Sequence, residues 1–153
     1  MSRSHTQSLI RDHIDQNPSL KQQRDLLNSI PGIGDLTATR LLAEIVDINQ
    51  YQSARQVAAF AGLVPKHRES GSSVRGRSKL CKVGTARLRK ALYFPALVAT
   101  QHNPIIKALS ERLRDGGKCP MVIIGAAMRK LIRITFGVLK SGKPFDPNYG
   151  KTA

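Results

Sequence analysis

The sequence has few acidic residues, and they do not cluster. Only 10 of the 153 residues are Asp or Glu, and they are scattered along the chain at spacings typical of exposed helix faces. Metal-dependent nuclease chemistry needs several carboxylates that converge on one or two ions. The four histidines also lack ligand spacing. We therefore predict no metal site and no cofactor in this chain.

Cysteines and long apolar runs are also scarce. The two cysteines, Cys81 and Cys119, lie far apart without the paired spacing of zinc sites. The longest apolar stretch, from Met121 to Met128, is far too short to cross a bilayer. Charged residues interrupt the N-terminus, so we find no secretory signal there. These absences predict a cytoplasmic protein with free thiols and no membrane partner.

Positive charge is abundant. The chain has 25 Lys and Arg residues against 10 acids, which gives a formal net charge of +15. A surface with this excess of positive charge favours polyanionic partners, and nucleic acid is the partner that we predict. Because 41% of the residues are hydrophobic, most of the chain is expected to fold around a core.

The apolar pattern favours an all-α fold, and we find neither a convincing strand pattern nor an internal repeat. We predict a short helical arm over residues 1–25, a helical domain over 26–147 and a tail over 148–153. Within the domain, helices are expected over residues 35–48, 54–61, 85–101, 104–115 and 120–140. Ser19, Ser53 and Thr85 are the predicted caps of three helices. The last helix is apolar nearly all round at its start, which predicts a central position in the core.

A tight turn between two helices is predicted at Ile30-Pro31-Gly32-Ile33-Gly34. Pro31 has no N–H and stops the first helix, while Gly32 and Gly34 permit unusual backbone angles and expose the main chain. Such a turn leaves free amides at a helix N-terminus, where a phosphate oxygen can bind. The pattern predicts a helix-hairpin-helix motif that contacts nucleic-acid backbone. The alternative is an ordinary αα-corner packed in the core.

A strongly basic segment follows in the middle of the chain. From Lys66 to Lys90 there are nine Lys or Arg residues and one acid, Glu69, and residues 69–79 are rich in Gly and Ser. Its composition predicts a loop or a short hairpin, and the charge density is too high for a plain linker. Arginine, lysine, serine and exposed glycine backbone all suit phosphate binding. Arg87, Arg89 and Lys90 on the next helix extend this basic patch.

Ser70 is a candidate nucleophile because it precedes a glycine in this arginine-rich loop. Nearby guanidinium groups would stabilise the charge that develops on a phosphodiester under attack. Ser72, Ser73 and Ser78 compete for this role, and all four serines can instead be loop formers or phosphate hydrogen-bonders. His67 lies in the same stretch and can touch phosphate or act as a base.

Taken together, the motifs resemble the C-terminal domain of the insertion-sequence one-ten (also called one-sixteen) transposases, a group that includes the Piv-type DNA invertases. The likeness covers roughly residues 17–147. It rests on Leu26–Gly34, Leu41–Ile45, Phe60–Pro65, Ser70-Gly71, Gly76-Arg77, Lys82, Gly84, Arg87–Leu92, Asn103-Pro104, Arg112-Leu113, Gly117-Lys118 and Met128–Leu131.

The resemblance implies a site-specific DNA recombinase. Family members join a RuvC-like domain, whose four acids bind divalent metal, through a coiled coil to a C-terminal domain with a serine thought to attack DNA. Ser70 matches that serine. The DNA-binding residues that we expect around it and in the hairpin are Gly32, Gly34, His67, Arg68, Gly71, Arg75, Gly76, Arg77, Lys79, Lys82 and Arg87. Some members use an element-encoded guide RNA, and the family acts as a multimer. The resemblance therefore implies that a guide RNA and a second copy of the chain, held through the N-terminal arm, are expected partners.

The chain departs from the family pattern in ways that bear on catalysis. It has no RuvC-like domain, and its N-terminal arm resembles the end of the coiled coil, so we expect a truncated transposase. Glu69 places an acid beside Ser70, which weakens the attraction for phosphate unless Arg68 or Arg75 pairs with it. Three alternatives remain: a domain that binds DNA without recombining it, a half-enzyme completed by another chain, and a non-catalytic helix-hairpin-helix binder of structured DNA or RNA.

Overall fold

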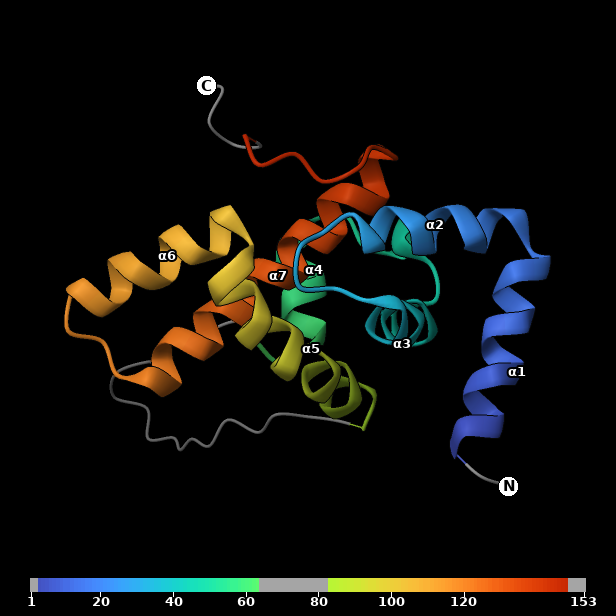
Figure 1. Ribbon diagram of the computed structural model, residues 1–153, viewed down its shortest axis with the longest axis horizontal. Helices are drawn as coiled ribbons and strands as arrows, with labels where there is room; N and C mark the ends of the chain where they lie inside the picture. Colours follow the sequence, from blue (N-terminus) through green and yellow to red (C-terminus); the bar gives the residue numbers. More distant parts are fainter. Residues whose placement is uncertain (1–2, 64–82, 149–153) are drawn as a thin grey trace.

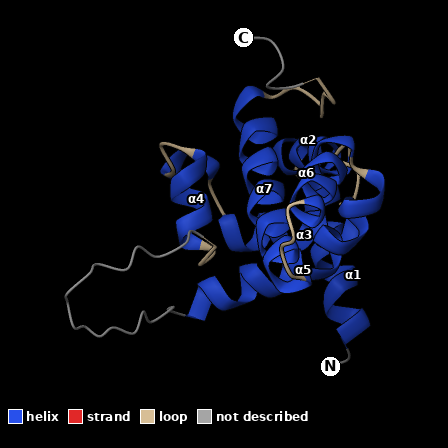
Figure 2. Ribbon diagram, turned by 90° about the vertical axis from the view of Figure 1, so that its left-hand side faces the viewer, coloured by secondary structure: helices blue, strands red, loops and turns tan. Residues whose placement is uncertain are grey.

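The computed structural model describes residues 3–63 and 83–148, and over these residues the fold is all-α (Figure 1). Seven α-helices and one 3-10 turn make up the described part, which contains no strand (Figure 2). The elements are α1 (Arg3–Gln16), α2 (Pro18–Asn28), α3 (Asp35–Ile45), η1 (Ile48–Gln50), α4 (Ala54–Phe60), α5 (Val83–His102), α6 (Pro104–Asp115) and α7 (Pro120–Ser141). The expectation of an all-α fold is confirmed.

Short polar side chains fix several helix starts. Ser53 accepts a hydrogen bond from the Gln56 amide at 3.3 Å, so it caps α4 as predicted. At α2 the prediction of Ser19 as the cap is wrong. Asn17 is the cap, and its Oδ1 accepts from the Ser19 amide at 3.1 Å. Because Pro18 needs no acceptor and has a helical φ, it occupies the first helical position and moves the start upstream.

Helix α7 supplies the centre of the core and packs against α2, α4, α5 and α6 (Figure 1). Leu131, Ile132 and Thr135 are fully buried. The predicted central position is right for this stretch but wrong for the first turn, where Met121 and Val122 are exposed. The helix ends at Gly142, whose φ of 69° is left-handed. None of the described helices is both long enough and apolar enough to span a membrane.

Helix α5 turns one face to the core and leaves the other exposed. Leu88, Leu92, Ala96 and Ala99 are fully buried and recur at the spacing of one helical face. The helix begins at Val83, so the predicted cap Thr85 lies inside it and that prediction is wrong. Pro95 lies within the helix. The packing of the Leu-Ala face holds the opposite face in a fixed position.

The turn between α2 and α3 is docked onto α5 and α6. Gly32 has a φ of 107°, and a Cβ added there would lie 2.9 Å from the Ala99 Cβ. The carbonyl of Pro31 accepts a hydrogen bond from Asn103 Nδ2 at 3.2 Å. Asn103 is fully buried and also caps α6 through its Oδ1. The turn is therefore part of the packed interior, and glycine is the residue that fits at position 32.

The two ends of the described chain are tied back to the same helix. Arg24 on α2 forms a 2.8 Å salt bridge with Asp15 on α1, and this hydrogen-bonded partner raises the pKa of Arg24. After α7, the Phe145 amide donates to Ser29 Oγ at 2.8 Å, just beyond the end of α2. These contacts fix α1 and the segment after α7, residues 142–148, against the two ends of α2.

Candidate nucleic-acid interface

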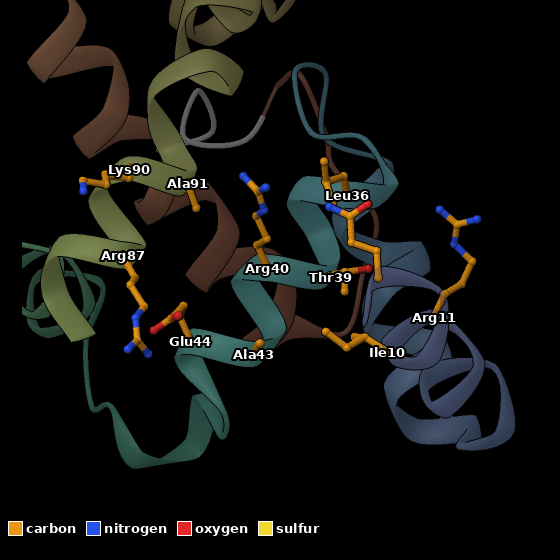
Figure 3. A pocket seen from close by; sticks show the side chains of 11 residues that line it. Ile10, Arg11, Leu36, Thr39, Arg40, Ala43, Glu44, Arg87, Lys90 and Ala91 are labelled. Carbon is orange, nitrogen blue, oxygen red and sulfur yellow. The ribbon is translucent and has the colours of Figure 1, made fainter. Parts of the chain in front are cut away.

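A groove of about 320 Å³ lies between α1, α3 and α5 (Figure 3). We call it the α1–α3–α5 groove. Each helix contributes about one face of side chains to it, so residues far apart in the sequence meet there. The lining residues are Gln7, Ile10, Arg11, Leu36, Thr39, Arg40, Ala43, Glu44, Arg87, Lys90 and Ala91.

Four of the lining residues are cations, and only one is an acid. Arg11, Arg40, Arg87 and Lys90 are exposed, whereas Glu44 is half-buried. Within the described residues, no salt bridge of 4.0 Å or less involves any of these cations. Four cations against one acid give the groove a positive potential that attracts a polyanion.

The groove also has an apolar component. Ile10, Leu36, Ala43 and Ala91 contribute hydrocarbon to its lining. Figure 3 shows Ala91 of α5 pointing into the gap between α5 and α3, with Ile10 on the α1 side of the groove. Cations beside small apolar side chains suit a sugar–phosphate backbone, because phosphate oxygens need donors while the sugars offer carbon surface.

The first turn of α3 borders the groove through Leu36. Gly34 is the N-cap without a side-chain hydrogen bond, and a Cβ added to it would meet nothing within 4 Å. The first amide of this helix to bond a backbone carbonyl is that of Ala38, to Gly34 O at 2.8 Å. The Asp35 carboxylate lies at the same helix start and accepts from Asn28 Nδ2 at 2.6 Å. Free amides and one negative charge thus meet at this end of the groove.

The two predicted glycines of the hairpin have different surroundings. Gly32 is half-buried against α5, whereas Gly34 is exposed at the start of α3. The packed turn supports the αα-corner alternative for Gly32. Phosphate binding by either glycine stays a prediction, and so does the helix-hairpin-helix function of the turn.

Among the other predicted site residues, Arg87 lies in the groove. Lys90, which was expected to extend the basic patch, lines it as well. The remaining predicted positions fall outside the described residues: His67, Arg68, Ser70, Gly71, Arg75, Gly76, Arg77, Lys79 and Lys82. The described chain reaches this segment from Leu63, whose carbonyl accepts from Arg129 Nη1 at 3.2 Å, and resumes at Val83 in α5.

Sequence reasoning missed Arg11 and Arg40 as parts of this site. Both belong to helices in which a charged residue is equally consistent with an ordinary solvated face. The spacing of Arg40 and Glu44 places them on one side of α3, but nothing in the sequence brings that side next to α5. Within the described residues, no group of three or more His, Cys, Asp or Glu side chains is close enough to hold a metal ion.

Comparison with known proteins connects this fold with mobile DNA elements. Residues 24–111 match the profile of the Transposase IS116/IS110/IS902 family. The chain is 38% identical to the pilin gene-inverting protein of Moraxella bovis over 134 residues. The aligned region covers 87% of this chain and 42% of that protein. It is 40% identical over 78 residues to the transposase for insertion sequence element IS1111A of Coxiella burnetii, covering 50% of this chain and 21% of that protein.

A third relative is the insertion element IS110 uncharacterized 43.6 kDa protein of Streptomyces coelicolor. The identity is 29% over 121 residues, which are 79% of this chain and 30% of that protein. The chain therefore spans less than half the length of these relatives. The groove-lining segments α3 and the first part of α5 fall within the residues that match the family profile.

Proposed function

The chain belongs to the Transposase IS116/IS110/IS902 family, and on that premise we propose that it is the DNA-binding part of a site-specific recombinase. The α1–α3–α5 groove is the surface that holds the DNA backbone. The observation that carries this proposal is the set of four exposed cations without salt-bridge partners among the described residues of one groove. A net charge of +15 adds a long-range attraction for DNA.

Ser70 is the nucleophile in this proposal. Its Oγ attacks a backbone phosphorus, and a serine–phosphate bond forms while the bond from phosphorus to one deoxyribose oxygen breaks. The hydroxyl proton passes to a base, and the departing sugar oxygen takes up a proton. Arg75 and Arg77 are close to Ser70 in sequence and would stabilise the charge on the phosphate.

Charge removal in the groove tests the binding site. We expect the double variant Arg40→Gln/Arg87→Gln to bind a duplex of the element end about tenfold or more weakly than the parent chain. The slope of log affinity against log salt should fall by about 2, one unit for each lost phosphate contact. Fluorescence anisotropy at several salt concentrations gives both quantities.

A matched control removes the same charge elsewhere. Lys130 and Arg133 are exposed on α7 and do not line the groove. The variant Lys130→Gln/Arg133→Gln should keep most of the affinity and of the salt slope. Equal losses in the two double variants would contradict a dedicated groove and leave only a diffuse attraction.

The nucleophile is tested by trapping. Incubation of the chain with element-end DNA should yield a covalent adduct that survives denaturation, and Ser70→Ala should abolish it. Ser72→Ala is the control and should retain the adduct. Binding without an adduct would refute the catalytic proposal and favour a non-catalytic binder of structured DNA or RNA.

Two further partners follow from the family and belong to the same proposal. One is an element-encoded guide RNA, for which the basic surface is suitable. The other is a second copy of the chain, for which α1 offers Leu9 with half of its surface exposed. Competition of a labelled duplex by the element's RNA tests the first, and light scattering of a Leu9→Glu variant tests the second.

A further inference from the structure

Helix α5 carries an aromatic pair on its exposed side. The Phe94 side chain is 71% exposed and that of Tyr93 is 40% exposed. The two rings form an edge-to-face contact with centroids 5.2 Å apart and an interplanar angle of 81°. Val98, on the same helix, is 47% exposed as well, so α5 presents several apolar side chains to solvent, and contiguous apolar surface of this kind is typical of contact surfaces.

The same exposed side of α5 contains groove cations. Arg87, Lys90, Phe94 and Val98 follow one another at intervals of three or four residues, which places them along one helix face. We call these four residues the α5 stripe. Arg87 and Lys90 line the α1–α3–α5 groove, and Phe94 comes about one turn beyond Lys90. The helix face that brings Arg87 and Lys90 to the groove therefore continues, outside the groove, to an exposed aromatic ring.

The α5 stripe is held on a rigid support. The opposite face of the helix carries Leu88, Leu92, Ala96 and Ala99, which are fully buried. The neighbouring Tyr93 ring packs edge-to-face with the Phe94 ring. A ring on such a support loses little conformational freedom when a flat ligand stacks on it.

The positive charge and the exposed aromatic ring together indicate which ligand the α5 stripe binds. A second copy of this chain would bring its own Arg87 and Lys90, and a net charge of +15, against the same surface. A DNA duplex satisfies the cations but keeps the faces of its bases stacked inside the helix. An unpaired stretch of DNA offers phosphates for the cations and a base face for the ring, which is how single-stranded nucleic acid is commonly bound.

We propose that the α5 stripe binds an unpaired segment of DNA, with a base stacked on Phe94 and the adjoining backbone phosphates at Arg87 and Lys90. The proposal rests on the proposed function, because it names the form of DNA that the groove receives. The stacking proposal also goes beyond the proposed function, because duplex binding through the cations does not require Phe94.

Affinity for single strands measures the role of the ring. The probe is a fluorescein-labelled oligothymidylate of about 20 nucleotides, long enough to span a site of the usual size for single strands, with a labelled duplex of the same length in parallel. Phe94→Leu keeps an apolar side chain but removes the aromatic face, so we expect about tenfold weaker binding of the oligothymidylate. Binding of the duplex should change by less than about twofold, because its bases stay stacked inside the helix.

A tryptophan reporter measures stacking directly. The natural chain has no tryptophan, so Phe94→Trp introduces a single one at the proposed contact. We expect this variant to bind the oligothymidylate at least as well as the parent chain, with its indole fluorescence strongly quenched at saturation. Met121→Trp is the matched control, since Met121 is an exposed apolar residue on α7 outside the α5 stripe; its fluorescence should stay nearly unchanged.

The outcomes separate this proposal from the proposed function. Parent-like single-strand affinity of Phe94→Leu, or unquenched indole fluorescence in Phe94→Trp, would overturn stacking on Phe94 whatever the duplex data show. Loss of duplex binding in Arg40→Gln/Arg87→Gln would still support the groove. A parent chain that self-associates, and becomes monomeric in Phe94→Leu by light scattering, would overturn the proposal and reassign the ring to a contact between copies.

Discussion

Substitution of the two glycines in the turn between α2 and α3 should have opposite effects on stability. We expect Gly32→Ala to be strongly destabilising and Gly34→Ala to be nearly neutral. In Gly32→Ala the new methyl group would lie 2.9 Å from the Ala99 Cβ and 3.0 Å from the Pro95 carbonyl oxygen. Overpacking of this kind costs roughly 1–3 kcal/mol. The φ of 107° adds strain of about 1–2 kcal/mol for any L side chain.

Part of this cost is offset in the unfolded chain. Replacing glycine by alanine removes unfolded conformations and returns about 0.4–1 kcal/mol. The net expectation for Gly32→Ala is a loss of about 2–4 kcal/mol in the free energy of unfolding. Urea denaturation followed by far-ultraviolet circular dichroism, with the slope m compared between variants, measures it.

Gly34→Ala is the internal control. Gly34 has an extended backbone with φ −100° and ψ −176°, and a Cβ there would meet nothing within 4 Å. Alanine is a poor N-cap, but the loss relative to glycine is offset by the unfolded-state gain, so we expect a change within about 0.5 kcal/mol. If the amides at the start of α3 bind phosphate, Gly34→Ala should weaken DNA binding without loss of stability.

Two outcomes of these glycine substitutions would contradict the predictions. Parent-like stability of Gly32→Ala would mean that the turn does not pack against α5 as described, and the placement of α3 beside the groove would lose its support. A large loss in Gly34→Ala would show that the start of α3 is not free, and phosphate binding at its amides would have to be abandoned.

Three further predictions concern hydrogen bonds and buried groups elsewhere in the fold. Asn103→Ala should lower the free energy of unfolding by about 2–3 kcal/mol, because α6 loses its cap and the Pro31 carbonyl loses its donor; Asn103→Ser should recover about half of this by restoring the cap. Ser29→Ala should remove hydrogen-exchange protection from the Phe145 amide and leave α7 protected, which NMR can check. Burial raises the pKa of Tyr51 above 10, so its neutral form contributes stability that is present below about pH 10 and is lost as the pH rises through the folded-state pKa. The stability of the parent relative to Tyr51→Phe should therefore be constant from about pH 7 to 9 and fall once the pH rises above about 10, as measured by denaturant unfolding at each pH.

Helix ends were predictable where a local rule acts alone. Asn103 followed by Pro104 opens α6 because the side chain satisfies the first amides and the proline needs no acceptor. The same rule explains Asn17 and Pro18 at α2, where the prediction favoured Ser19 instead. At α5 the helix extends upstream of Thr85 to Val83, since a possible cap does not stop a helix that can continue.

The groove was beyond sequence reasoning for a different reason. Periodicity tells which residues share a helix face, but not which face another helix covers. Arg87 was named because it adjoins a basic segment in sequence, whereas Arg11 and Arg40 have no such neighbours and meet it only through the packing of α1 and α3 near α5. Likewise, the apolar start of α7 gave no sign that Met121 and Val122 lie beyond the end of the core.

The width of the groove depends on an apolar contact, that between Gly32 in the turn and Ala99 on α5. The turn before α3 can approach α5 closely because the facing residues, Gly32 and Ala99, have almost no side chain. This approach sets how near the first turn of α3 lies to Ala91 of α5. Enlarging Ala99 to leucine should therefore push the two walls apart and weaken DNA binding, although every cation remains in place. If Ala99→Leu folds and binds with parent affinity, the groove geometry is not what holds the DNA, and the positive charge acts without it.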